Sequence, residues 1–177
     1  MRQACVPGRG RSRTIIGATE PRLNTRKLAP SRRRLHPGDV FAMLMPDDLY
    51  LFGRIVATNA AGPMGKGIVV YVFRARSATL APPPRAELVP DRLLLPPQFV
   101  NRYPWSQGYF ATVEHRPLLP GEVLPVHCFH EVIRDRYVDE NRAPMPGPVE
   151  PVGRFLLNSV RTLDDAVSEA LGIPLAP

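Results

Sequence analysis

The densest group of chemistry-bearing side chains lies at residues 127–130, which read His-Cys-Phe-His. Imidazole and thiolate groups are ligands that zinc prefers, so His127, Cys128 and His130 are candidate metal ligands. The segment has the apolar character of a strand, however, and neighbouring residues of a strand point to opposite faces. His127 therefore faces away from the other two, and no fourth ligand stands at a diagnostic spacing. The pattern favours a buried Cys128 and no bound metal.

No other pattern in the sequence supplies an active site. Asp39, Asp47, Asp48 and Asp135 form no recognisable pair of catalytic acids, and no serine lies in a Gly-x-Ser-x-Gly elbow. The segment 62–67 contains glycines and a lysine, but it lacks the Gly-Lys-Ser/Thr ending of a phosphate-binding loop. It also leads into a strand and not into a helix. We therefore predict that the protein is not an enzyme and uses no cofactor.

The elements that would position these residues are mostly strands. Apolar, β-branched and aromatic runs bounded by Gly, Pro or Asp turns are typical of strands. The first three runs follow one another through short links, which predicts an antiparallel meander, and the third is apolar on both faces, which predicts a central position. The expected strands are 40–45, 49–58, 67–74, 107–114, 126–134 with a continuation over 136–139, and 154–157.

A single helix is expected near the carboxyl end. Thr162 and Asp165 resemble a capping box, an apolar stripe with helical spacing follows, and Gly172 stands where the helix would end. Proline punctuates residues 80–98, so we expect a rigid surface loop there, with one helical turn at 91–95. The predicted fold is α+β: a mostly antiparallel, strongly bent and barrel-like sheet with one C-terminal helix.

Charge divides the chain into two parts. Of its formal net charge of +7, residues 1–34 hold ten Lys and Arg against the single acid Glu20, whereas residues 35–177 hold thirteen basic and fifteen acidic residues. We therefore expect a disordered basic tail over 1–35 and a single domain over 36–177. The tail is either a solvated segment or an arm that binds nucleic acid.

We expect a cytoplasmic protein that does not enter a membrane. Its two cysteines lie far apart in the sequence, as is usual in a reducing compartment. The sequence has no apolar run long enough to span a membrane, and its N-terminal segment lacks the apolar core of a signal peptide.

The amino-acid sequence resembles that of immunity protein family 26 of bacterial polymorphic toxin systems. Residues 36–56 carry the opening of this resemblance: a Pro-Gly-Asp entry, a Val-Phe-Ala strand, an acidic turn and the return strand Phe-Gly-Arg-Ile-Val. Further matches in the same order extend it over about residues 36–175. They lie at 69–73, 105–110, 127–129 with 137–140, 152–157, and 161–165.

The resemblance implies a non-catalytic protein that binds a cognate toxin and blocks it by occlusion. If the toxin is a nuclease, its basic substrate groove is complemented by acidic residues, and aromatic residues are enriched at interfaces. The expected toxin-binding residues are therefore Asp47, Asp48, Asp139 and Glu140, together with Trp105 and Tyr109. Trp105 is equally well interpreted as a core residue at the edge of the sheet.

Two other functions stay open at this point. A small β-rich module could bind nucleic acid through its Arg-rich tail and the aromatic residues of its sheet. A metal hydrolase could be built on His127, Cys128 and His130. The slightly acidic charge of residues 35–177 speaks against the first, and the alternation of strand residues speaks against the second. The sequence does not indicate the oligomeric state.

Overall fold

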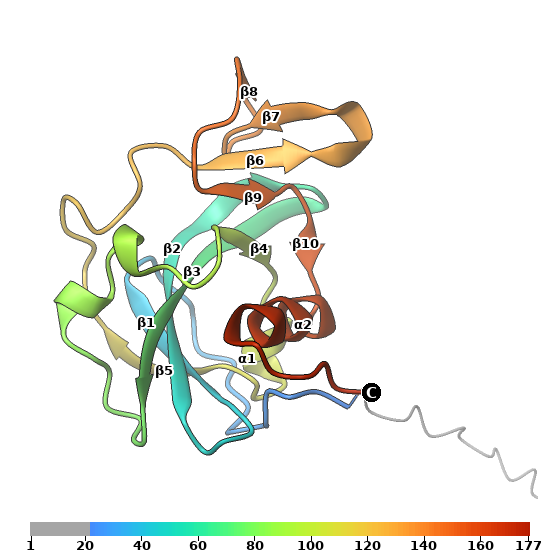
Figure 1. Cartoon of the computed structure of the whole chain (residues 1–177). Helices are drawn as coiled ribbons and strands as arrows, with labels where there is room; N and C mark the ends of the chain where they lie inside the picture. The colour runs from blue at the N-terminus through green and yellow to red at the C-terminus, as the bar shows by residue number, and fades with distance from the viewer. Residues whose placement is uncertain (1–21) are drawn as a thin grey trace, which may run out of the picture.

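The structure, a computed structural model, describes residues 22–177 and folds them into two β-sheets and a C-terminal helix. The larger sheet has the strand order β10-β4-β3-β2-β1-β5, and the smaller has the order β8-β7-β6-β9. Figure 1 shows the small sheet at one end of the long β2–β3 ribbon. The strands are β1 Asp39–Leu44, β2 Tyr50–Gly62, β3 Gly65–Ser77, β4 Gln98–Val100, β5 Ala111–His115, β6 Cys128–Glu131, β7 Arg136–Val138, β8 Pro144–Met145, β9 Val152–Arg154 and β10 Leu157–Asn158.

The predicted meander is confirmed, and its second hairpin is longer than expected. β1 pairs antiparallel with β2, β2 pairs antiparallel with β3, and β3 lies inside the sheet. The sequence analysis expects a loop at 60–66, but pairing continues to Gly62 and Gly65, so that only Pro63 and Met64 form the tip. The α+β, mostly antiparallel fold is also confirmed. Over the described residues the larger sheet stays open, with β5 and β10 as its edges.

Side chains pack on both faces of the larger sheet. Alternation along β1 sends Phe41 and Met43 to one face and Val40 and Ala42 to the other, and all four are buried. The first face is covered by two helices, α1 Tyr103–Ser106 and α2 Val160–Leu171, and the second by the small sheet. This burial on both faces explains why the central strands are almost wholly apolar.

The N-cap of the C-terminal helix lies three residues before the predicted one. Ser159 is the N-cap, and its side-chain oxygen accepts a hydrogen bond from the Thr162 amide, so Thr162 lies inside α2. Gly172 ends the helix in the left-handed conformation, as predicted. No helix within residues 22–177 is long and apolar enough to cross a membrane.

The proline-rich segment 80–98 contains two short 3-10 turns, η1 Arg85–Glu87 and η2 Pro90–Arg92. The second begins one residue before the expected helical turn and ends three residues earlier. The sequence analysis missed β4, which pairs with β3 and β10 directly after the prolines. This segment therefore helps to build the larger sheet.

Residues 22–35 differ from the predicted disordered tail. They run in extended form along the domain, where Arg26 makes a bridge with Leu44 and the Leu28 amide donates to the Gly108 carbonyl at 2.7 Å. Thr25 is buried, and its amide and hydroxyl both donate to Asp164. These long-range contacts order a segment whose composition is that of a tail. The remainder of the predicted tail, residues 1–21, lies outside the described residues.

Candidate functional site

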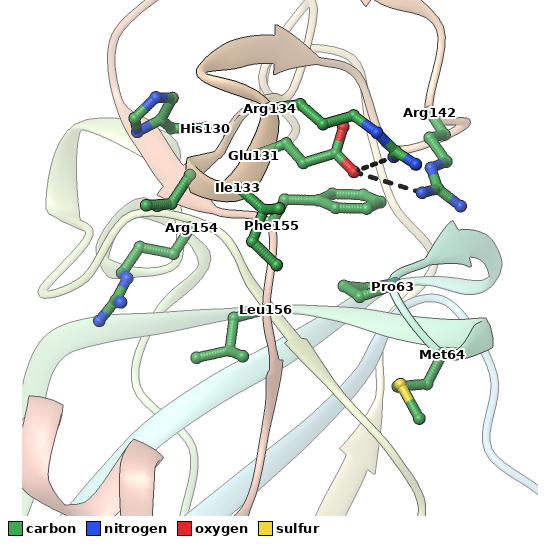
Figure 2. A pocket seen from close by; sticks show the side chains of 11 residues that line it. Pro63, Met64, His130, Glu131, Ile133, Arg134, Arg142, Arg154, Phe155 and Leu156 are labelled. Carbon is green, nitrogen blue, oxygen red and sulfur yellow. Dashed lines mark hydrogen bonds and ion pairs between the residues drawn. The ribbon is translucent and has the colours of Figure 1, made fainter.

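A cleft of about 570 Å³ opens between the tip of the β2–β3 hairpin and the small sheet. One wall is the hairpin tip, and the other is the connection from β6 to β7, which contains the 3-10 turn η3 Val132–Arg134. The segment between β9 and β10, which joins the two sheets, completes the lining. Figure 2 shows Phe155 near the centre of the lining residues and Pro63 and Met64 on the hairpin at its side.

Large apolar side chains around this cleft are exposed to solvent. The exposed fractions are 82% for Met64, 98% for Ile133, 60% for Val132 and 39% for Leu156. Single exposed apolar residues are ordinary on protein surfaces, but a group of them around one hollow is typical of an interaction site. The cleft is therefore the candidate functional site of the described chain.

Local backbone geometry places these residues outside the core. β6 ends at Glu131, and the chain then makes one 3-10 turn that is followed by Asp135 in the left-handed conformation, with φ of 44°. In the hairpin, Gly65 has φ of 105°, which permits the tight turn that projects Met64. Both apolar tips are thus presented by turns that are anchored in strands.

A buried carboxylate organises the charges beside the cleft. Glu131 is 8% exposed and contacts three guanidinium groups: Arg134 at 2.6 Å, Arg136 at 2.6 Å and Arg142 at 3.2 Å. The hydrogen bond from Arg136 is the main cause that holds the pKa of Glu131 below its usual value. Three positive charges therefore surround one negative charge.

One further cation, Arg154, extends this basic margin across the cleft. Arg154 has no carboxylate partner among residues 22–177, and its side chain extends away from the Glu131 cluster (Figure 2). The Arg142 guanidinium also lies over the Phe155 ring, 5.5 Å from its centre. The cleft thus combines an apolar centre with a margin of arginines.

The predicted acidic residues do not gather on one face. Asp47 forms an ion pair with Arg76 at 2.6 Å, and Asp48 forms one with Arg26, at the turn before β2. Hydrogen bonds from Arg76 and the Leu49 amide outweigh burial and hold the pKa of Asp47 below its usual value.

The other two acids lie at the far end of β2. The Asp139 carboxylate accepts hydrogen bonds from the Asn141 and Ala143 amides, so it shapes the turn between β7 and β8. The Glu140 carbonyl accepts from the Ala61 amide at 2.8 Å, next to the hairpin tip. The two acidic turns are thus separated by the length of a 13-residue strand, about 40 Å when fully extended.

Trp105 and Tyr109 are core residues. Trp105 is 0% exposed and packs edge-on against Phe41 and Phe110, with ring centres 5.3 and 4.9 Å apart. Tyr109 is 6% exposed. Of the two interpretations of Trp105, the structure therefore supports the core residue, and neither aromatic side chain presents a contact surface to a partner.

The histidines and the cysteine of 127–130 have separate structural roles. The His127 Nε2 lies 2.7 Å from the Tyr71 hydroxyl, and its Nδ1 lies 3.3 Å from the Glu140 carboxylate. Burial raises the pKa of Tyr71 to about 12, so the phenol stays protonated. Cys128 is buried, as predicted, and His130 instead contacts Asp135 at 3.0 Å. Within residues 22–177 there is no group of three side chains that could hold a metal ion.

Sequence reasoning missed the cleft, because its walls come from residues 63–64, 130–134, 142 and 154–156. One local signal points to it. Val132 and Ile133 stand between Glu131 and Arg134, in a stretch where a strand was expected to continue to residue 134. Two β-branched residues at the end of a strand can equally be core residues, so their exposure is visible only in the fold.

Comparison with known proteins identifies one family. The family model described as Immunity protein 26 matches residues 36–139, more than half of the chain. No curated protein and no solved structure matches the chain. The matched region runs from before β1 to the end of β7 and includes Met64 and the η3 turn, whereas Arg142 and Arg154 lie beyond it.

Proposed function

The chain belongs to the immunity protein 26 family, and from this premise we propose that it neutralises one cognate bacterial polymorphic toxin by binding it and covering its active surface. Such a protein needs a surface that a partner can cover, and it needs no reactive group. Membership of the family implies that the chain is an immunity protein of a toxin system. The toxin, the blocking mechanism and the cytoplasm of the producing cell as the place of action are part of the proposal.

The cleft beside the β2–β3 hairpin carries this proposal. Four exposed aliphatic side chains around one hollow lose contact with water when a partner covers them, and this loss of apolar surface favours association. Both walls are turns fixed by strands, so little conformational entropy is lost on binding. A patch of about 800 Å² per partner, the usual size for a stable complex, extends beyond the cleft to its arginine margin.

Binding by occlusion also fits the positions of the other polar groups. Asp139 shapes a turn, and His127 is buried between Tyr71 and Glu140. These groups hold the domain together and are engaged in internal contacts. Neutralisation therefore depends on the outer surface of the protein and on its shape.

A growth-rescue experiment tests the proposed function. The polymorphic-toxin C-terminal domain encoded next to this chain is expressed alone and together with the full chain of 177 residues. We expect the toxin alone to stop growth and co-expression to restore it. Titration calorimetry with a catalytically inactive form of the toxin should then give a 1:1 complex in the nanomolar range. Continued toxicity together with no measurable binding contradicts the proposal.

A further inference from the structure

We propose that the cleft between the β2–β3 hairpin and the small sheet receives a segment of the toxin that carries apolar side chains flanked by Asp or Glu. This inference rests on the proposed function and specifies the chemistry of the partner. It differs from the expectation that acidic turns of this protein meet a basic groove of the toxin. The argument has three steps: the apolar centre, the charge of its margin and the rigidity of the arginines.

The apolar centre requires an apolar counterpart. Met64 and Ile133 are almost fully exposed and come from two different sheets, yet both border the same cleft. A polar occupant would leave these side chains without contacts and would lose its own hydration. An aliphatic or aromatic side chain of the partner, placed between the two tips and above Phe155, covers both.

The margin carries a net positive charge. Arg134, Arg142 and Arg154 line the cleft together with Glu131, and Arg136 is bound to the same Glu131 carboxylate. With the neighbouring Asp135, the cluster holds four positive charges and two negative ones. Residues 35–177 as a whole are slightly acidic, so this basic cluster is local. Carboxylates on the partner complement it and accelerate association.

Glu131 fixes three of these arginines before any partner arrives. Its two carboxylate oxygens hold Arg134, Arg136 and Arg142 at 2.6 to 3.2 Å. Each guanidinium has several further N–H donors, which can point outward to a carboxylate of the partner. A preordered cation loses less entropy on binding than a freely rotating one. Arg154, without a carboxylate partner among the described residues, offers its charge directly.

The same features speak against nucleic acid as the occupant. Proteins that bind single strands stack bases on aromatic side chains, whereas the exposed side chains here are Met, Val, Ile and Leu. Phe155, the aromatic residue of the cleft, is partly covered by Arg142. A phosphate chain would gain from the arginines but would leave the aliphatic centre in contact with water.

Two substitutions test the two halves of the proposal. Ile133→Asp places a like charge where the partner's acidic segment would lie, and Arg154→Glu reverses the charge of the margin. The Ile133 side chain is 98% exposed, and the Arg154 side chain forms no ion pair within residues 22–177, so the fold should tolerate both changes. The matched controls are Leu80→Asp, at a 43% exposed leucine outside the cleft, and Arg74→Glu, on the exposed surface of β3 away from the hairpin tip.

The readouts are the dissociation constant and the association rate with the inactive toxin domain, each at two salt concentrations. We expect Ile133→Asp to weaken binding by at least about 30-fold, as for an interface hot spot. Arg154→Glu should slow association about 10-fold at low salt and reduce its salt dependence. Both control variants should bind like the wild type. Unfolding by urea checks that all four variants are folded.

Four other outcomes would overturn the inference, and each leads to a different conclusion about the cleft. If the wild type and both cleft variants bind the toxin equally well, the cleft is not the contact surface and the proposed function still stands. If the wild type binds no toxin, both fail together. A wild-type dimer that Ile133→Asp dissociates assigns the cleft to a second copy of the chain. Binding of a fluorescent 20-nucleotide single strand that Arg154→Glu abolishes assigns it to nucleic acid.

Discussion

The guanidinium of Arg54 lies 3.0 Å from the Glu122 carboxylate, and both side chains are buried. Arg54 belongs to β2, in the middle of the larger sheet, whereas Glu122 lies in the long connection between β5 and β6. Arg85 approaches the same carboxylate at 2.8 Å, and Arg54 also donates to the Arg116 carbonyl at 2.7 Å. Arg54 thus fastens the β5–β6 connection to the sheet, and Arg85 joins the β3–β4 connection to the same carboxylate. The small sheet begins with β6, directly after the first of these connections.

Glu122→Gln is expected to destabilise the protein by about 3 kcal/mol. The substitution leaves the Arg54 charge buried without its counter-charge, and a broken buried pair costs more than an intact one contributes. Burial itself raises the pKa of Glu122, but hydrogen bonds from Arg85 and the Leu119 amide, together with the Arg54 charge, bring it below its usual value. The free energy of unfolding in urea measures the effect.

The double variant Arg54→Met, Glu122→Leu is the control for this prediction. It removes both charges and keeps most of the side-chain volume, so it should regain a large part of the lost stability. A double variant that is less stable than Glu122→Gln contradicts the assignment of the cost to an unpaired charge.

Acid should weaken the attachment of the turn that carries Glu140. The hydrogen bond from His127 is the main cause that holds the pKa of Glu140 below its ordinary value of 4.5. A carboxyl with a lowered pKa stabilises the fold fully above its unfolded pKa, and this contribution is lost as the pH falls through its folded pKa. Glu140→Gln should therefore lower the free energy of unfolding by about 1 kcal/mol at pH 7 and by much less near pH 3. Urea unfolding across this range measures the difference, which should not stay constant with pH.

Regular patterns in the sequence predict the regular part of this fold. Apolar, β-branched and aromatic runs bounded by turns predict β1, β2 and β3, and an apolar stripe before Gly172 predicts α2. The errors occur where contacts distant in sequence decide the structure. Residues 22–35 have the composition of a tail, but the buried Asp164 and the carbonyl of Gly108 accept hydrogen bonds from them. β4 has three residues and follows prolines, so its pairing with β3 leaves no local pattern.

The candidate site illustrates the same limit. Residue types indicate a surface contact through the acidic turns, but they do not tell which turns share a face. The strand length between Asp47 and Glu140 separates them, whereas the fold brings Met64 and Ile133 to one cleft across 69 positions of the chain. The charge of each residue is given by the sequence, but the exposure of Met64 and Ile133 and their meeting at one cleft are visible only in the fold.

Gly53→Ala should destabilise the larger sheet strongly. A Cβ at this position would lie 2.2 Å from Cζ of Phe41 and 2.6 Å from the Tyr71 carbonyl oxygen. Phe41 cannot move aside easily, because its ring stacks on Phe110 at 4.5 Å and packs against Trp105. We expect a loss of about 3 kcal/mol from overpacking, measured by thermal and urea unfolding. Gly147→Ala, where a Cβ meets nothing within 4 Å, is the matched control and should change stability little.

The position at which the folded domain begins can be tested through Asp164. This carboxylate is 2% exposed and accepts hydrogen bonds from the Thr25 amide at 2.6 Å, the Thr25 hydroxyl at 2.7 Å and the Asn24 amide at 2.9 Å. A chain that begins at residue 36 lacks all three donors and retains the carboxylate. It should be at least about 3 kcal/mol less stable than a chain that begins at residue 22.

The substitution Asp164→Leu should then have opposite effects in the two chains. In the chain from residue 22 it removes an acceptor and leaves the Thr25 donors unpaired in a buried position, so it should destabilise. In the chain from residue 36 it replaces an unpaired carboxylate on the apolar side of α2 by an apolar side chain, so it should stabilise. Urea unfolding of the four proteins measures both signs. Equal effects in the two chains would mean that residues 22–35 contribute nothing to the fold through Asp164.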